Sequence, residues 1–478
     1  MAKFIVRIIA RSYEQLRGLD KYHLDLKKRT AREEDTNRFV VSGILTEQQI
    51  EQVRSAGYTV EILSDLTQMS RERTQEVSKV NRFIKTKETS ELRKSTETGG
   101  YMNADEVETA LMNLSESHPD FITLIELPNR TWEGRLCRAV LIHAGNTVGG
   151  TTVNKNNNFD NRTGILITGG MHAREWGGSD ICINFLTNLI DSYLNNTTII
   201  YGETTFPPVQ IKKMLESIDL FVFPDVNPDG KIYSQTNDDS NLAPDNEGIW
   251  WRKNRNPASV PNVDDPTYHG IGVDINRNFD FLWSSGIGTV NSDGTNSGET
   301  FRGTTAFSEP ETKNVKYLLD TYSTIKYYAD VHSFGEMILY SWGDDDNQSL
   351  DHEMNFQNPK YDRVRGRPRD SDYKEYIENQ DEKTLKNLAS RMNYSLERVR
   401  GRKYRVQQAV GLYPTSATSD DYVFSRHITN GNTQKIYGFT IEFGKEDTGF
   451  IPPFSEMQNV INEVSSALTE LCIAVTSR

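Results

Sequence analysis

Short alternations of apolar and polar residues predict four strands near the beginning of the chain. Each alternation has the two-residue period of a strand, as Phe4, Val6 and Ile8 illustrate against the residues between them. The predicted strands cover residues 4–9, 24–27, 39–44 and 58–63.

Two helices and a turn connect these strands. The first helix is predicted over 12–20. The second begins after Thr46, whose spacing to Gln49 is a capping-box signature, and stops at Gly57. The polar segment 29–37 predicts a turn between the second and third strands. The resulting order, strand–helix–strand–strand–helix–strand, is that of a ferredoxin-like open sandwich.

The pattern changes twice along the rest of the chain. Residues 66–97 are rich in Lys, Arg, Glu, Ser and Thr and poor in large apolar residues, which predicts an exposed helix or linker. From Met102 onward, longer helical and apolar strand patterns alternate. We therefore predict a small module over 1–65, a linker over 66–97 and a large domain over 98–478.

The large domain is predicted to be an α/β domain with a mixed, largely buried sheet, because helical and strand patterns alternate through it. The helices are predicted at 103–116, 175–196, 208–217, 308–324 and 455–473, and the strands at 121–127, 138–143, 164–170, 219–226, 326–331 and 438–443. A ligand site in such a sheet lies at the carboxyl ends of the strands. The polar segment 343–378 indicates an insertion or a long loop.

Charge separates the two parts of this 478-residue chain. Residues 1–97 hold 19 Lys and Arg against 15 Asp and Glu, so their net charge is +4. Because the net charge of the whole chain is −13, the remaining residues carry −17. The acidic total argues against a general nucleic-acid-binding protein. Both parts could simply be solvated. The alternatives are that the basic module docks on the acidic domain, or that the acidic domain favours cationic substrates.

The cysteines and the apolar runs bear on location and on metal chemistry. Cys137, Cys182 and Cys472 are too few and too scattered for a disulfide framework or a thiolate metal site, although one disulfide stays open. No apolar run reaches the roughly 18 residues of a transmembrane helix, so we expect no membrane segment. The apolar stretch at the N-terminus is too short for a secretory signal, which makes a cytoplasmic location the default expectation.

Three residues at predicted strand ends form a candidate metal centre. His172 and Glu175 follow the strand 164–170, and His332 directly follows the strand 326–331. Two His and one Glu, with a position left open for water, are the ligands of a catalytic zinc site. Each residue alone has an ordinary explanation, such as a Glu favoured at a helix start or a His packed at a strand end. Their combination at one edge of the sheet favours the metal.

Further candidates lie in three other segments. Asp274 could accept a hydrogen bond from a ligand imidazole, and the nearby Asn276 and Arg277 are of the types that hold a carboxylate. Arg252 follows two tryptophans. Glu442 lies inside an apolar strand, where a carboxylate is costly to bury, so it either points outward or serves chemistry.

Residues 98–478 resemble the zinc metallocarboxypeptidases of the carboxypeptidase A/B family. The resemblance rests on five segments in the same order as in the family: His172-Ala173-Arg174-Glu175-Trp176, Asn227-Pro228-Asp229-Gly230, Val273-Asp274-Ile275-Asn276-Arg277-Asn278-Phe279, His332-Ser333-Phe334 and Thr440-Ile441-Glu442-Phe443. It implies a single large domain on a mixed sheet of the eight-stranded type. The module over 1–65 is similar to the family's inhibitory pro-segment, and the family is often secreted.

The resemblance also implies a role for each candidate residue. One zinc ion per chain would be bound by two His and one Glu, with one Glu as general base and acid and one Arg polarising the scissile carbonyl. The remaining residues would bind the substrate or orient a ligand. The zinc ligands would be His172, Glu175 and His332, the general base and acid would be Glu442, and the polarising residue would be Arg252. The substrate would be bound by Arg174, Asn276, Arg277 and Tyr413, and Asp274 would orient His172.

The same resemblance predicts the substrate. Peptide or protein C-termini would be cleaved one residue at a time by a monomeric enzyme made as a zymogen. Asp420 takes the pocket-floor position that is acidic in B-type members, which predicts some preference for Lys or Arg, although a solvated Asp pair with Asp421 is the ordinary alternative. Phe334 stands where the family usually has Tyr, and the insertion 343–378 could reshape the pocket rim.

Two other functions stay open. A related zinc amidase acting on peptidoglycan peptides or other amide side chains would use a similar metal site, but such enzymes often lack the carboxylate clamp or the mobile tyrosine. A non-catalytic binding protein of the same fold would lack Glu442 or a zinc ligand. All these residues are present in this chain.

Overall fold

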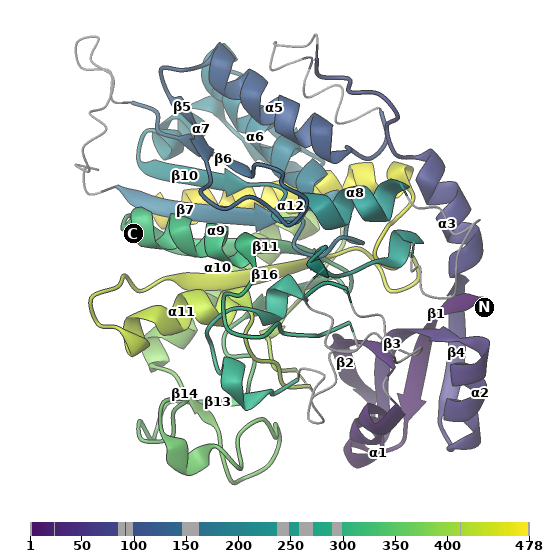
Figure 1. Ribbon diagram of the computed structural model, residues 1–478. Coiled ribbons are helices and arrows are strands. Elements are labelled where there is room, and N and C mark those ends of the chain that lie inside the picture. The colour runs from purple at the N-terminus through teal and green to yellow at the C-terminus, as the bar shows by residue number, and fades with distance from the viewer. Residues whose placement is uncertain are drawn as a thin grey trace.

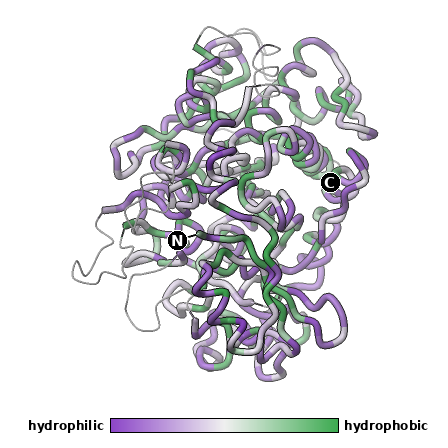
Figure 2. Tube along the Cα trace, turned by 90° about the vertical axis from the view of Figure 1, so that its right-hand side faces the viewer, coloured by the Kyte–Doolittle hydropathy of each residue, from purple (hydrophilic) through white to green (hydrophobic). Residues whose placement is uncertain are grey.

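The computed structural model describes residues 2–22, 24–84, 91, 99–145, 162–236, 248–257, 271–288, 299–411 and 413–476. Figure 1 shows a small module at the N-terminal end, in purple, against one side of a larger body built on a central sheet. Hydrophobic segments run mainly through the interior, and hydrophilic segments lie mainly around them (Figure 2). None of the described helices is both long and apolar enough to cross a bilayer.

The N-terminal module is a four-stranded antiparallel sheet in the order β2–β3–β1–β4. Its elements are β1 (Lys3–Ala10), α1 (Tyr13–Arg17), a 3-10 turn (Gly18–Tyr22), β2 (Asp25–Asp35), β3 (Arg38–Thr46), α2 (Glu47–Ser55) and β4 (Thr59–Asp65). This element order confirms the predicted ferredoxin-like open sandwich. Thr46 and Gln49 make both hydrogen bonds of the predicted capping box at the start of α2.

The predicted turn over 29–37 is wrong. Strand β2 continues to Asp35, and the turn consists only of Thr36 and Asn37. The polar residues that suggested a turn lie on a strand whose face is covered by the body; Arg29 and Thr30, for example, are buried. A polar strand is stable here because the body supplies partners for its side chains, as described below.

The body confirms the predicted mixed α/β sheet. It has eight strands in the order β15–β12–β16–β11–β7–β10–β6–β5. They are β5 (Ile122–Glu126), β6 (Arg138–Ile142), β7 (Thr163–Gly169), β10 (Ile218–Phe223), β11 (Ile325–Ser333), β12 (Met337–Tyr340), β15 (Arg405–Gln408) and β16 (Tyr437–Phe443). The central strands β16, β11, β7 and β10 are parallel, so their carboxyl ends meet at one edge of the sheet.

Helices flank this sheet (Figure 1). They are α5 (Ala104–Ser117), α6 (Gly177–Asn195), α7 (Pro208–Leu215), α8 (Pro228–Thr236), α9 (Pro310–Thr321), α10 (Asn379–Arg400), α11 (Ser419–Thr429) and α12 (Phe454–Thr476). Helix α3 (Leu66–Gln75) packs instead against β1 and β4 of the module. Helix α12 packs along α10 and α6, and α11 packs against β11 and β16. A hairpin of β8 (Ile199–Tyr201) and β9 (Thr204–Phe206) lies between α6 and α7 in the chain.

The predicted linker is only partly described, whereas the predicted insertion is described throughout. In the linker, α3 buries Leu66 and Arg73, and Phe83 is fully buried, while 85–90 and 92–97 lie outside the described residues. The segment 343–378 is mostly loop, with a short strand pair, β13 (Asn347–Gln348) and β14 (Glu375–Tyr376). The three cysteines are buried and free, so the structure has no disulfide.

Candidate active site

Two strand ends and one turn bring the predicted metal ligands together. His172 and Glu175 lie in the turn between β7 and α6, because α6 begins at Gly177 rather than at Glu175 as predicted. His332 lies near the end of β11, the strand next to β7. One ligand atom from each residue lies within 4.8 Å of the others, and all three side chains are buried. The predicted group is therefore assembled by adjacent parallel strands.

The imidazoles are oriented for a shared metal. The Nδ1 atoms of His172 and His332 lie 2.9 Å from Glu175 Oε1 and Oε2 respectively, so both rings turn Nδ1 toward the common centre. Their Nε2 atoms face outer carboxylates, at 3.1 Å from Asp274 Oδ1 and 2.6 Å from Asp330 Oδ2. A ring nitrogen held by a carboxylate behind each His is the usual support of a zinc ligand. The donor set and its outer partners therefore fit zinc.

Asp330 is a site residue that the sequence analysis missed. It precedes His332 by two positions on β11, so both side chains lie on the same face of the strand. Thr168 Oγ1 and Ser419 Oγ also donate to its carboxylate, at 2.8 and 3.0 Å. Burial alone would lower the pKa of His332, but the charge and hydrogen bond of Asp330 raise it to about 10. The period-two spacing to His332 was the available signal.

Glu442 points to the same edge as the metal ligands. Strand β16 is parallel to β11, and Glu442 pairs in register with His332. Side chains at paired positions of neighbouring strands emerge on the same face, so the carboxylate stands beside the metal centre. Glu442 is 2% exposed. Of the two interpretations made from the sequence, the outward orientation is therefore wrong, and the chemical role stays a prediction.

Asp274 connects the metal centre to Arg252. Its Oδ2 atom accepts from Arg252 Nε and Nη2 at 3.1 and 2.9 Å, while its Oδ1 atom faces His172. Burial by itself would raise the pKa of Asp274, but Arg252 and His172 hold it far below its usual range. Arg252 Nη1 lies 3.8 Å from Glu175 Oε1, which places the guanidinium at the edge of the metal site.

Asn276 and Arg277 lie in a 3-10 turn, Ile275–Arg277, directly after Asp274. Asn276 is partly occupied, because its Oδ1 accepts from Ser419 N at 2.8 Å and its Nδ2 lies 3.3 Å from His332 Nε2. Arg277 Nη1 donates to the Asn276 carbonyl, and its Nε has no hydrogen-bond partner among the described residues. Burial lowers the pKa of Arg277 to about 10. Arg277 is thus a buried cation with an unused donor.

Asp420 and Asp421 form the first turn of α11, and both are fully buried. Asp420 Oδ2 accepts from Thr440 Oγ1 at 3.0 Å, and its Oδ1 has no hydrogen-bond partner among the described residues. Burial raises the pKa of Asp421 well above its usual range, with a further contribution from Asp420, so Asp420 carries the charge of the pair. The alternative of a solvated Asp pair is wrong for this conformation, because neither carboxylate reaches solvent.

Two predicted substrate-binding residues are occupied by the N-terminal module. Arg174 donates to both carboxylate oxygens of Asp25 on β2, at 2.7 and 3.1 Å. The Tyr413 hydroxyl donates to the carbonyl of Leu16 at 2.7 Å, and its ring is buried among the module's apolar residues. Both side chains therefore contact the module in this structure.

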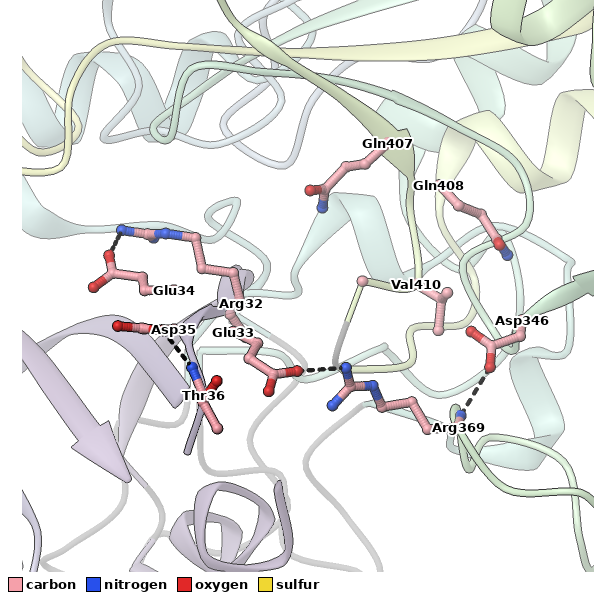
Figure 3. A pocket seen from close by; sticks show the side chains of 12 residues that line it. Arg32, Glu33, Glu34, Asp35, Thr36, Asp346, Arg369, Gln407, Gln408 and Val410 are labelled. Atoms are coloured by element: carbon pink, nitrogen blue, oxygen red, sulfur yellow. Dashed lines mark hydrogen bonds and ion pairs between the residues drawn. The ribbon is translucent and has the colours of Figure 1, made fainter. Parts of the chain in front are cut away.

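A cavity of about 590 Å³ lies between the module and the body, away from the metal ligands. Figure 3 shows its lining, with the end of β2 on one side and the insertion on the other. Arg369 of the insertion crosses this space, and its Nη2 lies 2.8 Å from Glu33 Oε2. Its guanidinium also lies 5.6 Å from the ring centres of Tyr13 and Phe39. The insertion therefore contacts the module through Arg369.

The sequence profile of one family matches most of the body. The profile described as zinc carboxypeptidase covers residues 107–467, about three quarters of the chain. The chain therefore belongs to the zinc carboxypeptidase family.

Individual relatives agree with this assignment. Carboxypeptidase B of Helicoverpa zea is 31% identical over 250 residues, which are 52% of this chain and 48% of that protein. Carboxypeptidase B of Rattus norvegicus is 26% identical over 373 residues, 77% of this chain and 69% of that protein. The chain spans about half the length of the relatives from Helicoverpa zea and Drosophila melanogaster that it matches.

A solved structure shares the fold. The carboxypeptidase A of Helicoverpa armigera superposes with a TM-score of 0.69 at 18% identity, covering 100% of this chain and 98% of that chain. The crystal structure of thrombin activatable fibrinolysis inhibitor gives 0.67, also at 18% identity, with all of both chains covered. At this identity the likeness shows the fold alone, and it extends over both the module and the body.

Proposed function

We propose that the chain is a zinc-dependent carboxypeptidase that hydrolyses the C-terminal peptide bond of peptides or proteins and releases single residues. The observation that carries the proposal is the convergence of His172, Glu175 and His332 with Glu442 in register beside them. These are the ligands of a catalytic zinc site and a carboxylate placed for proton transfer. Membership of the zinc carboxypeptidase family supports the same activity.

The proposed mechanism assigns one task to each side chain. His172, Glu175 and His332 would hold zinc, which would supply Lewis-acid chemistry that makes a water more acidic and a carbonyl more electrophilic. Glu442 takes the proton of the attacking water and passes it to the leaving amine. Arg252, held by Asp274, donates to the oxygen on which negative charge develops.

Arg277 and Asn276 are proposed to restrict cleavage to the chain end. Arg277 keeps an unpartnered Nε, so it can donate to a terminal carboxylate. An internal residue offers no such carboxylate and leaves the buried cation unpaired, which is costly. Tyr413 is proposed to close over the bound residue once its hydroxyl leaves the Leu16 carbonyl.

Peptides that differ only in a free or an amidated C-terminus test this proposal. The chain should be treated with limited trypsin first, because Arg71 in α3 is exposed and the module covers the site. We expect release of the last residue from the free peptide alone, loss of that activity with a chelator, and recovery with zinc. Equal cleavage of the amidated peptide, or no zinc-dependent cleavage after trypsin, would contradict the proposal.

We further propose a preference for C-terminal Lys or Arg. Asp420 supports it, because a buried carboxylate with an unpartnered Oδ1 is stabilised by a cationic side chain. Several relatives named carboxypeptidase B agree with a subsite for basic side chains. The amidase alternative is not favoured, since the named relatives are carboxypeptidases A, B and O. We also propose that the protein is a monomer. Its parts are proposed to be the module over 1–65, the linker over 66–97 and the large domain over 98–478.

Changing Asp420→Asn is expected to reverse this preference. The amide keeps an acceptor for Thr440 Oγ1 but removes the charge, so kcat/KM for an Arg-ending peptide should fall by roughly 10- to 150-fold. The rate on the matched Leu-ending peptide should change little, and that ratio corrects for any loss of folded enzyme. Asp351→Asn, an exposed site on the insertion, is the control variant. An unchanged ratio of kcat/KM between the Arg-ending and Leu-ending peptides would show that Asp420 does not determine the preference for the C-terminal side chain.

A further inference from the structure

Strand β2 of the N-terminal module lies over the candidate active site. Asp25, Lys27 and Arg29 alternate along the strand, so their side chains share one face. Lys27 and Arg29 are 9% and 6% exposed, although both have long side chains that end in a cationic group. Such residues are almost never buried without partners, so the body must supply them.

Lys27 binds the proposed general base. Its Nζ donates to Glu442 Oε2 at 2.8 Å and to the Ser333 carbonyl at 2.7 Å. The same ammonium lies 3.9 Å from Glu175 Oε1, one of the metal ligands. The ammonium therefore occupies the space between Glu442 and Glu175, where the attacking water would have to lie, and it pairs with the carboxylate that would take the water's proton. The contact therefore disables the residue on which the proposed chemistry depends.

Arg29 extends toward the pocket floor. Its Nη2 lies 3.7 Å from Asp420 Oδ1, and its Nη1 lies 3.7 Å from Glu442 Oε1. Both Arg29 Nη2 and Asp420 Oδ1 lack a hydrogen-bond partner among the described residues, so the guanidinium stops short of direct contact. The Arg29 guanidinium thus lies where the cationic side chain of a C-terminal Lys or Arg would lie. Its distance to Asp420 is longer than in a bidentate arginine–carboxylate pair.

Contacts around the site hold the strand in place. Asp25 occupies Arg174, as described above, and Arg7 Nη2 lies 2.7 Å from Glu446 Oε2. Arg32 also pairs with Glu446, and Ser64 Oγ donates to the Asp447 carbonyl at 2.6 Å. Lys27, Arg7 and Arg32 of the module thus pair with acidic groups of the body, and docking of the N-terminal part on the acidic remainder is confirmed as one of the two alternatives that the charge distribution left open.

We propose that β2 is a built-in pseudo-substrate, in which Arg29 fills the subsite for a basic C-terminal side chain and Lys27 neutralises Glu442. The inference rests on the proposed function and names the regulation of the same site. It differs from a module that only covers the entrance, because it assigns the blockade to two cations that contact the site residues themselves. A ligand with a free guanidinium should compete with Arg29 for Asp420.

Binding of L-arginine to the intact chain tests the pseudo-substrate directly, without requiring turnover. By isothermal titration calorimetry, Arg29→Ala and Arg29→Gln should each bind L-arginine at least about tenfold more tightly than the wild-type chain, as expected for exposing one buried charged partner. Arg29→Lys keeps the cation and should exclude L-arginine as the wild type does. L-Leucine should gain nothing. Equal affinities for L-arginine in the wild type and both neutral variants would overturn the inference.

Activity of the intact chain separates this inference from the proposed function. Lys27→Ala/Arg29→Ala, loaded with zinc and not cleaved, should hydrolyse an Arg-ending peptide at least about tenfold faster than the wild type. Arg54→Ala is the matched control, since the Arg54 guanidinium donates to Glu51 and to the Val60 carbonyl, both within the module. A double variant that binds L-arginine but hydrolyses nothing would contradict the proposed function alone. One that hydrolyses peptides no faster than wild type, with L-arginine affinity unchanged, would contradict the pseudo-substrate alone.

Discussion

Glu442→Gln is expected to lower kcat for C-terminal hydrolysis by roughly 100- to 10,000-fold, the contribution typical of a general acid–base group. Glutamine has nearly the same shape, but it cannot take the proton of the attacking water. Glu442 is buried and pairs in register with the proposed metal ligand His332, so a carboxylate from solution cannot take its place. KM should change much less than kcat, because the carboxylate acts in the transition state rather than in binding.

The measurement needs two forms of the protein. In the intact chain Glu442 also holds Lys27, so the variant would weaken the docking of the module at the same time. Rates should therefore be compared after limited trypsin, with zinc content and thermal unfolding measured in parallel. Glu203→Gln, at an exposed position in the turn between β8 and β9, is the matched control. If Glu442→Gln kept more than about one tenth of the wild-type kcat, another group would be the base.

The second large effect is expected at the metal centre. His332→Ala removes one of three ligands and should weaken zinc affinity by more than about 100-fold, beyond the 10- to 100-fold typical of losing an outer partner. Asp330→Asn, which leaves the ligand in place but removes the carboxylate behind it, should fall within that smaller range. Zinc affinity, measured by competition with a chromophoric chelator, should therefore decrease in the order wild type, Asp330→Asn, His332→Ala.

His352→Ala is the control for these variants, because His352 is 77% exposed at the side chain and lies on the insertion. It should bind zinc as tightly as the wild type. Peptidase activity should follow zinc content in Asp330→Asn when zinc is limiting, and recover when zinc is added in excess. Equal zinc affinity in His332→Ala and the wild type would place the metal elsewhere.

Contacts between the module and the body explain why some segments of each are polar. Segment 29–37 looks like a turn because it is polar, yet it belongs to a strand whose partners are acidic groups of the body. Lys27 and Glu442 are 415 positions apart, so no local pattern could relate them. The insertion 343–378 is likewise polar for a reason that only its position shows, since Arg369 reaches Glu33 of the module.

The sequence by itself determined the parts that depend on local physical chemistry. Local patterns predicted the four strands of the module and six of the eight strands of the body, all except β12 and β15, and the spacing of Thr46 and Gln49 predicted the start of α2. The ends of the predicted strands located His172, Glu175 and His332, because ligands at the carboxyl ends of parallel strands converge. The order of five short segments then identified the family.

The tertiary structure alone decided the features that depend on partners distant in sequence. Short edge strands such as β15 are too brief and polar to be recognised, since pairing with β12 creates them. The inward orientation of Glu442 and the support of His332 by Asp330 required the register of neighbouring strands. The occupation of the site by Lys27 and Arg29 required the docking of two domains. A buried charge is tolerable only opposite its partner, and the chain shows that partner only once it is folded.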